Sequence, residues 1–283
     1  MVAGDVPAAV RAWRDADIDM RRRVGLPEIV WDDREIARSE VRAFHFLRTD
    51  PEGSWVVEVD GVVSGLAQAH RREGLWVLAH LFVAPLAQGC GAGHELIDRT
   101  LEYGSRDEPG LIISSRDPRA MRRYAVAGFA LHPAVVAWGR VRPERLSPPP
   151  DVRSGDGADL ELAAAVDRRL RGAARTADLA LCLEEGDRML VVPERGFALL
   201  RETRVVPVVA LDEDVARQLL TAGLLEAAKQ GRAPAEVARM TAAQGWAMEV
   251  ALAAGLELHP HGPIFVRGRP GPLAPYLPDG ALG

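Results

Sequence analysis

The sequence predicts a mixed α/β protein in which a central sheet is flanked by helices, with two such domains in one chain. Three observations lead to this class. Residues 54–59 alternate in strand fashion, and two turn signals divide residues 54–83 into three strands, which is typical of an antiparallel meander. Strands and helices then alternate up to residue 141, as in sheets covered by helices. A proline-rich stretch at residues 147–150 divides the 283 residues into two segments of ordinary domain size.

The first domain is expected to cover residues 1–145. Its glycine-rich loop, residues 88–93, is followed at once by a helix. Asp60-Gly61 and Glu73-Gly74 mark the two turns of the meander. Helical spacing of apolar residues predicts the helices. The predicted helices are residues 10–23, 33–47, 118–127 and the one that leads from the glycine-rich loop to about residue 103; the predicted strands are residues 54–59, 62–69, 75–83, 111–114 and 135–141.

Composition restricts the classes of function. The net charge is −5 and the arginines are scattered among acids, so we expect no nucleic-acid partner. The two cysteines, Cys90 and Cys182, form no C-x-x-C pair, which argues against a zinc knuckle or a disulfide framework. The first residues lack the features of a signal peptide, and no apolar run approaches the ~20 residues of a membrane span. We therefore expect a cytoplasmic protein without a membrane partner.

The glycine-rich loop between a strand and a helix predicts an anion site. Such a loop points backbone N–H groups at one place, where the N-terminus of the following helix adds a positive dipole end. A pyrophosphate fits this arrangement. A Walker loop requires Gly-Lys-Ser/Thr, which is absent, and His94 stands where a dinucleotide fingerprint has its last glycine.

The string around this loop resembles the signature of the GNAT N-acyltransferases. In that family a strand ends near Val-x-Pro and is followed by Gln/Arg-x-x-Gly-x-Gly/Ala and a helix. Val83, Pro85, Gln88, Gly91 and Gly93 match this pattern. The resemblance implies the GNAT fold, acetyl-CoA (coenzyme A) as cosubstrate, and a loop that holds its pyrophosphate. The cofactor-binding residues that it implies are Leu81, Phe82, Val83, Gln88, Gly89, Cys90, Gly91, Ala92 and Gly93.

A second family motif, Tyr-x-x-x-Gly-Phe at the end of a helix, is matched by Tyr124, Gly128 and Phe129. In many members this tyrosine protonates the leaving thiolate, and a phenol can donate at neutral pH. The resemblance covers roughly residues 55–141. It implies a catalytic role for Tyr124, while the alternative is a core aromatic residue with its hydroxyl at the surface.

The proposed chemistry also requires a general base. The incoming amine must lose a proton before it attacks. His80 is the one titratable side chain on the strand before the glycine-rich loop, and a neutral imidazole suits this task. It could equally face the other side of the strand. Glu73 in the preceding turn is a weaker candidate, and family members also use a chain of water molecules.

Residues 152–268 follow the linker at residues 146–151 and contain a faint echo of the first half. Strands are predicted at residues 205–211, 239–241 and 263–267, and helices at 214–229 and 245–254. Ala251 stands where Tyr124 would align. The acidic run Asp212-Glu213-Asp214 replaces the glycine-rich loop and would repel a pyrophosphate. We expect a tandem protein with a degenerate second domain, the alternative being an unrelated α/β domain. The Pro/Gly-rich tail, residues 269–283, is expected to be a loosely ordered arm.

The sequence thus predicts an N-acetyltransferase that acts on a small-molecule amine, and a homodimer is possible. The alternative is a non-catalytic acyl-CoA-binding or sensing protein. No metal site is expected, because His259-x-His261 lacks a third ligand. The acceptor and the acyl-chain preference are not encoded in any motif that we recognise.

Overall fold

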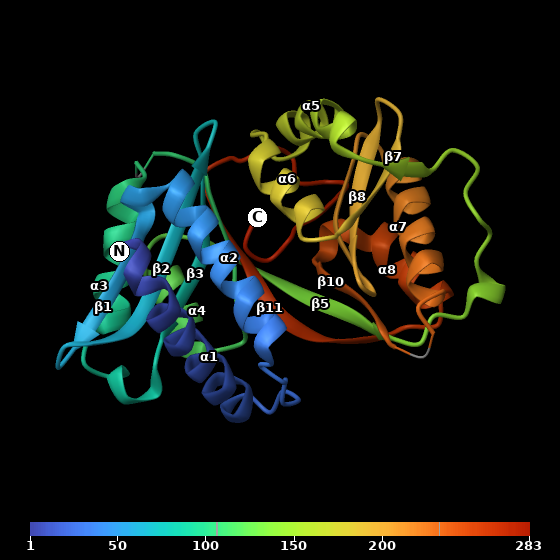
Figure 1. The fold of residues 1–283 in the computed structure, drawn as a ribbon. Helices are drawn as coiled ribbons and strands as arrows, with labels where there is room; N and C mark the ends of the chain where they lie inside the picture. The colour runs from blue at the N-terminus through green and yellow to red at the C-terminus, as the bar shows by residue number, and fades with distance from the viewer. Residues whose placement is uncertain (106, 232) are drawn as a thin grey trace.

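One mixed sheet of twelve strands runs through both halves of the protein in this computed structural model, which describes residues 1–105, 107–231 and 233–283 (Figure 1). Helices cover both faces of the sheet, so the predicted mixed α/β class is confirmed. The elements of the first half are α1 (Val6–Arg23), α2 (Asp33–Thr49), β1 (Ser54–Val59), β2 (Val62–Arg72), β3 (Leu75–Val83), α3 (Ala92–Tyr103), β4 (Gly110–Ile113), α4 (Pro118–Val126) and β5 (Ala130–Gly139).

The second half repeats this order of helices and strands. Its elements before residue 204 were not predicted from the sequence. The elements of the second half are β6 (Arg153–Gly155), α5 (Leu160–Leu170), α6 (Thr176–Glu184), β7 (Arg188–Val192), β8 (Gly196–Arg201), β9 (Arg204–Ala210), α7 (Glu213–Ala228), β10 (Ala235–Met240), α8 (Gly245–Ala253), β11 (Glu257–Arg267) and β12 (Tyr276–Leu277).

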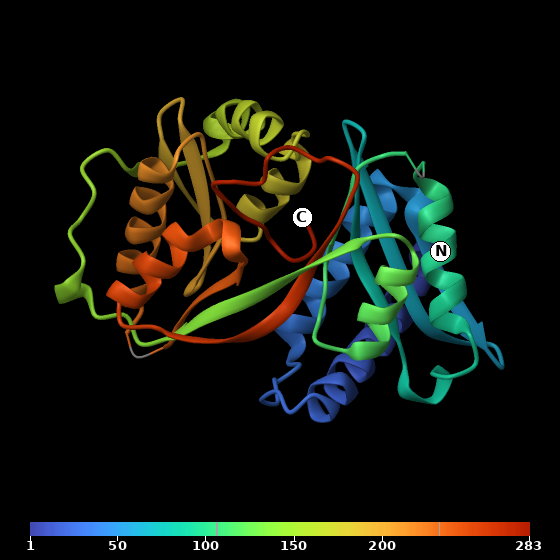
Figure 2. The ribbon, with the colours of Figure 1, turned by 180° about the vertical axis from the view of Figure 1, so that it is seen from behind.

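The two halves exchange their last long strands. The strand order reads β3-β4-β11-β5-β10-β9 through the centre, so β11 lies between β4 and β5, and β5 lies between β11 and β10. β5 and β11 are antiparallel partners, with Ala137 opposite Leu258. Each strand begins earlier than predicted, β5 at Ala130 and β11 at Glu257, because each pairs with two strands of the other half. The exchange is visible at the centre of Figure 2, and it contributes Phe265 to the core of the first half and Ala137 to that of the second.

Helices α1 and α2 cover one face of β1–β3, and α3 and α4 cover the opposite face (Figures 1 and 2). The local sequence accounts for the start of α4. The Asp117 side chain accepts from the backbone N–H of Arg119, and Pro118 occupies the first turn, so α4 begins there. Among the described residues, no helix combines the length and apolar character needed to cross a bilayer.

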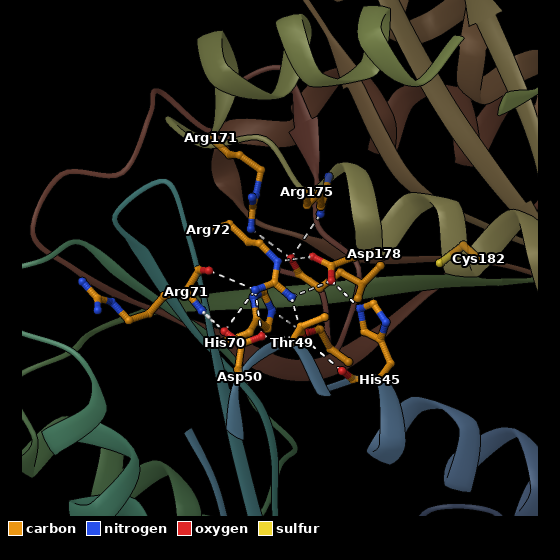
Figure 3. A network of polar contacts seen from close by, with 12 residues as sticks. His45, Thr49, Asp50, His70, Arg71, Arg72, Arg171, Arg175, Asp178 and Cys182 are labelled. Atoms are coloured by element: carbon orange, nitrogen blue, oxygen red, sulfur yellow. Dashed lines mark hydrogen bonds and ion pairs between the residues drawn. The ribbon is translucent and has the colours of Figure 1, made fainter. Parts of the chain in front are cut away.

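A buried network of charges joins the halves (Figure 3). Arg72 of β2 pairs with Asp50 and with Asp178 of α6, each at 2.8 Å. Asp178 also contacts His45 Nε2 of α2 at 2.7 Å. These contacts hold the pKa of Asp178 well below its usual range, although burial opposes them. Removing one partner of such a network leaves a buried charge uncompensated, so the network resists separation of the halves.

The tail differs from the loosely ordered arm that its composition predicts. Tyr276 and Leu277 form β12 on the edge of β9, and Tyr276, Leu277 and Leu282 are buried. The returning chain passes between the two halves (Figure 2). The prolines and glycines of the tail correctly predict an irregular backbone. Three large apolar side chains nevertheless anchor the tail in the core.

Candidate functional site

An open edge of β3 forms the base of the main cleft. β3 and β4 pair in parallel only from Trp76 opposite Gly110 to Leu78 opposite Ile112. Beyond this point the chain after β4 turns to β11, where Ser114 N–H donates to Pro263 O at 3.0 Å. The strands splay apart and leave a cleft of about 220 Å³ between them.

A β-bulge decides which side chains of β3 face the cleft. His80 lies opposite Gln68 and Leu78 lies opposite Ala69, so Ala79 has no partner of its own on β2. The extra residue reverses the alternation of side chains. Leu78 therefore packs with the core under α3 and α4, while His80 lies under α1 and α2 against Trp13.

The glycine-rich loop lies at the mouth of the splay. Gly89 and Gly91 have φ angles of 88° and 95°, which side chains rarely adopt, and Gly91 is the N-cap of α3. The Gln88 side chain fixes the loop to the strand by donating to Val83 O at 2.9 Å. Of the predicted cofactor-binding residues, Leu81, Phe82, Val83, Gln88, Gly89 and Gly93 line the cleft, whereas Cys90, Gly91 and Ala92 line a separate groove.

Three arginines of the cleft were not predicted from the sequence. Arg119 and Arg123 come from α4 and Arg23 from the end of α1. Arg119 Nη1 donates to Gln88 Oε1 at 2.7 Å, so one guanidinium directly supports the glycine-rich loop. Arg119 and Arg23 also pair with Asp117, at 2.9 and 3.3 Å. The run of arginines before Tyr124 was the available signal.

Asp117 is the one carboxylate among the described residues that line the cleft. Burial opposes its ionised form, but hydrogen bonds from Arg119 and the charges of Arg119 and Arg23 lower its pKa overall. It is therefore an anion that holds the arginines in place. The cleft keeps an excess of positive charge at the end where the glycine-rich loop lies.

Tyr124 lines the inner part of the same cleft and is 5% exposed. Its ring packs edge-on against Phe265, with centroids 5.4 Å apart. Burial, together with the charge of Asp117, raises the pKa of the phenol above its ordinary value. The hydroxyl is therefore protonated at neutral pH and able to donate.

His80 is 4% exposed and does not line the cleft. Its ring lies 4.4 Å from that of Trp13, between centroids. Burial lowers the pKa of His80 to about 3, with a smaller effect from the charge of Arg42. The imidazole is therefore neutral at pH 7. It lies on the side of β3 that α1 covers, close to Leu78, the last residue of β3 that pairs with β4.

Gln68 determines the tautomer of His80. The Gln68 amide nitrogen donates to Ala43 O at 2.9 Å and to Ser54 Oγ at 3.1 Å. Its oxygen must then be the atom that contacts His80 Nδ1 at 2.9 Å, so Nδ1 carries the proton. Nε2 keeps its lone pair and has no hydrogen-bond partner in the described part of the chain.

Glu73 does not belong to this site. Its carboxylate pairs with Arg168 at 2.7 Å and accepts from the backbone N–H of Ala174 at 3.0 Å, both in the second half. The reason is topological: β3 begins just after Glu73 and reaches the cleft only at its other end. The described residues also contain no group of three His, Cys, Asp or Glu side chains that could hold a metal ion.

The corresponding connection of the second half has no glycine-rich loop. β9 ends at Ala210 and α7 begins at Glu213, so only Leu211 and Asp212 lie between them. Asp212 caps α7 by accepting from Val215 N–H at 3.0 Å. The helix N-terminus is thus satisfied by a carboxylate of the chain itself, and an added phosphate would be repelled.

Residues 20–129 match the model of the acetyltransferase (GNAT) family. No curated protein matches the chain. A putative acetyltransferase from Pyrococcus horikoshii has a TM-score of 0.76 at 17% identity, with 100% of this chain and 94% of that chain covered. A GCN5-related N-acetyltransferase from Sphaerobacter thermophilus has a TM-score of 0.58 at 16% identity, with 96% and 95% covered.

A tandem GNAT protein from the clavulanic acid biosynthesis pathway has a TM-score of 0.56 at 17% identity, with 94% of this chain and 96% of that chain covered. At such identities the likeness concerns the fold alone. It confirms the GNAT fold that the sequence predicts, and it extends over both halves.

Proposed function

We propose that this chain, whose residues 20–129 match the model of the acetyltransferase (GNAT) family, transfers an acetyl or short acyl group from acyl-CoA to a primary amine. One observation carries the proposal. A single cleft joins a glycine-rich loop flanked by arginines at its mouth to the open edge of β3 and to a protonated tyrosine at its inner end.

The residues of the cleft suit the donor part by part. Backbone N–H groups of the glycine-rich loop and the N-terminus of α3 would bind the pyrophosphate. The guanidinium groups of Arg119 and Arg123 would neutralise it. From Ala79 to Val83, the edge of β3 that faces away from β2 is open and offers N–H and C=O groups to the amides of the pantetheine arm. Leu81 and Phe82 would enclose its methylene groups.

Acyl transfer then proceeds by direct attack. The amine nitrogen bonds to the thioester carbon, and a backbone N–H on the open edge of β3 stabilises the negative charge on the carbonyl oxygen. As that oxygen reforms the carbonyl, the carbon–sulfur bond breaks. The Tyr124 hydroxyl donates its proton to the departing sulfur and regains one from solvent. The products are the amide and the free thiol.

The proton lost by the amine is assigned to His80, by way of a water molecule because the ring does not line the cleft. The lone pair on Nε2, held in place by the bond from Nδ1–H to Gln68, supports this role. Because the ring is neutral at pH 7, this lone pair is free to accept a proton. The acceptor would then approach from the side of α1 and α2.

A non-catalytic acyl-CoA-binding protein is the alternative function, and thiol release distinguishes the two. Purified protein is incubated with acetyl-CoA and a panel of small primary amines, and free thiol is measured against Tyr124→Phe. We expect amine-dependent release by the unaltered protein that falls at least about tenfold in the variant. Tight acetyl-CoA binding without amine-dependent release across the panel would favour the binding protein instead.

A further inference from the structure

The two halves are related by the order of their strands, which makes β9 and β10 the counterparts of β3 and β4. Read outward from the central β5–β11 pair, each half presents a strand antiparallel to its central neighbour, β4 or β10, and then a strand parallel to that one, β3 or β9. β10 and β9 pair only at Glu236 opposite Arg204, so this second pair also splays apart. The second half therefore has a position equivalent to the cleft of the first half.

The tail of the chain fills this second position. Tyr276 pairs with Val209 and Leu277 with Val208, in antiparallel register. The same two residues of β9 already pair with β8 on their other edge. β12 therefore lies on the edge of β9 that faces β10, where the first half leaves β3 open.

The side chains of β12 complete the cores on both faces of the sheet. Leu277 is 0% exposed and belongs to the cluster under α7 and α8. Tyr276 is 2% exposed and belongs to the cluster that contains Phe46 of the first half. A segment that alternates between two buried faces is an integral strand and not a surface arm.

Contacts along the rest of the tail reach both halves. Ala281 O lies 3.1 Å from His70 Nε2 of β2, and Leu282 O accepts from Arg171 at 3.0 Å. Asp279 lies 3.7 Å from Arg201 of β8, and the charges of Arg201 and Arg239 lower its pKa to about 2 although burial opposes this. Figure 3 shows His70 on the first half and Arg171 on the second half.

We infer that the second half is a groove for an extended peptide segment, and that residues 276–282 of the same chain are its permanent occupant. The tail makes the main-chain pairs along β9 that the donor would make along β3. This inference rests on the proposed function in one respect, that the ligand which binds along β3 is acyl-CoA. It predicts one acyl-CoA site per chain, with a tail that no acyl-CoA displaces.

Hydrogen exchange of the full chain tests the inference, with and without saturating acetyl-CoA. We expect the amides of residues 276–282 to exchange at least about a hundredfold more slowly than exposed tail amides, as in a sheet core, and to keep this protection with ligand. Fast exchange of the tail, or loss of its protection when acetyl-CoA is added, would overturn the inference. Absence of any acetyl-CoA binding would count against the proposed function, while protection without ligand would still support the tail as occupant.

A pair of variants isolates β12. Leu277→Asp places a carboxylate at a fully buried site, and we expect it to release the tail and expose residues 276–282 to exchange. Ala274→Asp adds the same charge at an exposed position of the tail and should leave the protection unchanged. If the tail of Leu277→Asp remained protected, pairing along β9 would not be what holds it. If this variant unfolds, the exchange of the unaltered chain decides alone.

Discussion

The rings of Tyr124 and Phe265 meet edge-on at 5.4 Å, although the two residues belong to different halves of the chain. Tyr124 lies on α4 of the first half, and Phe265 reaches it because β11 crosses from the second half to pair with β4. The position of the proposed proton donor therefore depends on the strand exchange. The second half contributes to the first site even though its own equivalent cleft is filled.

Replacing Phe265 with Ala is expected to destabilise the fold by roughly 3–5 kcal/mol, the usual effect of removing a large buried ring. The remaining folded protein should also show a lower kcat, because Tyr124 loses the ring that orients it. Denaturant unfolding and steady-state kinetics measure the two effects. Leu258→Ala on the same strand is the control, since Leu258 is 40% exposed. Equal effects of the two substitutions would contradict the assigned contact.

Replacing Tyr124 with Phe is expected to lower kcat at least about tenfold while the affinity for acetyl-CoA changes little. The substitution removes only the hydroxyl, and the ring keeps its packing against Phe265. Kinetics and equilibrium binding are measured on the same preparation. An unchanged kcat would remove Tyr124 from the proposed chemistry.

Replacing Arg119 with Gln is expected to weaken acetyl-CoA binding by roughly 1.5–3 kcal/mol, the range for a hydrogen bond to a charged group. The side chain would lose both its charge and its contact with Gln88. Arg122→Gln is the matched control, because Arg122 lies on the same helix but does not line the cleft. A comparable loss in both variants would point to a general effect of charge.

Replacing His80 with Gln is expected to lower kcat at least about tenfold and to leave acetyl-CoA affinity nearly unchanged, if Nε2 takes up the amine proton. Gln68→Met tests the tautomer separately, since it removes the acceptor for Nδ1–H. Nitrogen NMR should show protonated Nδ1 and unprotonated Nε2 in the unaltered protein and a mixture in Gln68→Met. A kcat unaffected by His80→Gln would leave His80 as a core residue only.

The fold is expected to lose stability as the pH falls from 6.5 toward 4. Burial lowers the pKa of His70 to about 4, below the ~6.5 of an unfolded histidine. Between these values the unfolded chain binds a proton that the folded chain does not, so unfolding becomes easier at lower pH. For one fully buried histidine the loss amounts to roughly 3 kcal/mol over this window.

Urea unfolding at pH 7 and pH 5 measures this dependence. His70→Gln should reduce the difference between the two pH values, whereas the same change at His94, an exposed residue of α3, should not. An identical pH dependence in both variants would contradict the assignment to His70.

The site was predicted from the sequence where its parts are local and not where they are assembled from distant segments. Gly89 and Gly91 reveal a tight loop before a helix, and Tyr124 lies in a short motif. The arginines of α4 could have been predicted as cleft residues from their spacing around Tyr124. The face of the sheet on which His80 lies depends on the extra residue Ala79. The local sequence contains no pattern that predicts this β-bulge.

The arrangement of the two halves lay beyond the sequence for a similar reason. Which strand fills the gap beside β4 is decided by pairing between residues about 150 positions apart, such as Ile113 and Ile264. The tail illustrates the same limit. Its prolines and glycines indicate irregular backbone, but the burial of Tyr276 and Leu277 depends on the groove that β9 provides.

A calorimetric titration of the purified protein with acetyl-CoA tests the central claim most directly. The account predicts saturable binding with one site per chain, located in the first half and weakened by Arg119→Gln. Two sites per chain would contradict the filled second position, and no binding would contradict the acyltransferase itself.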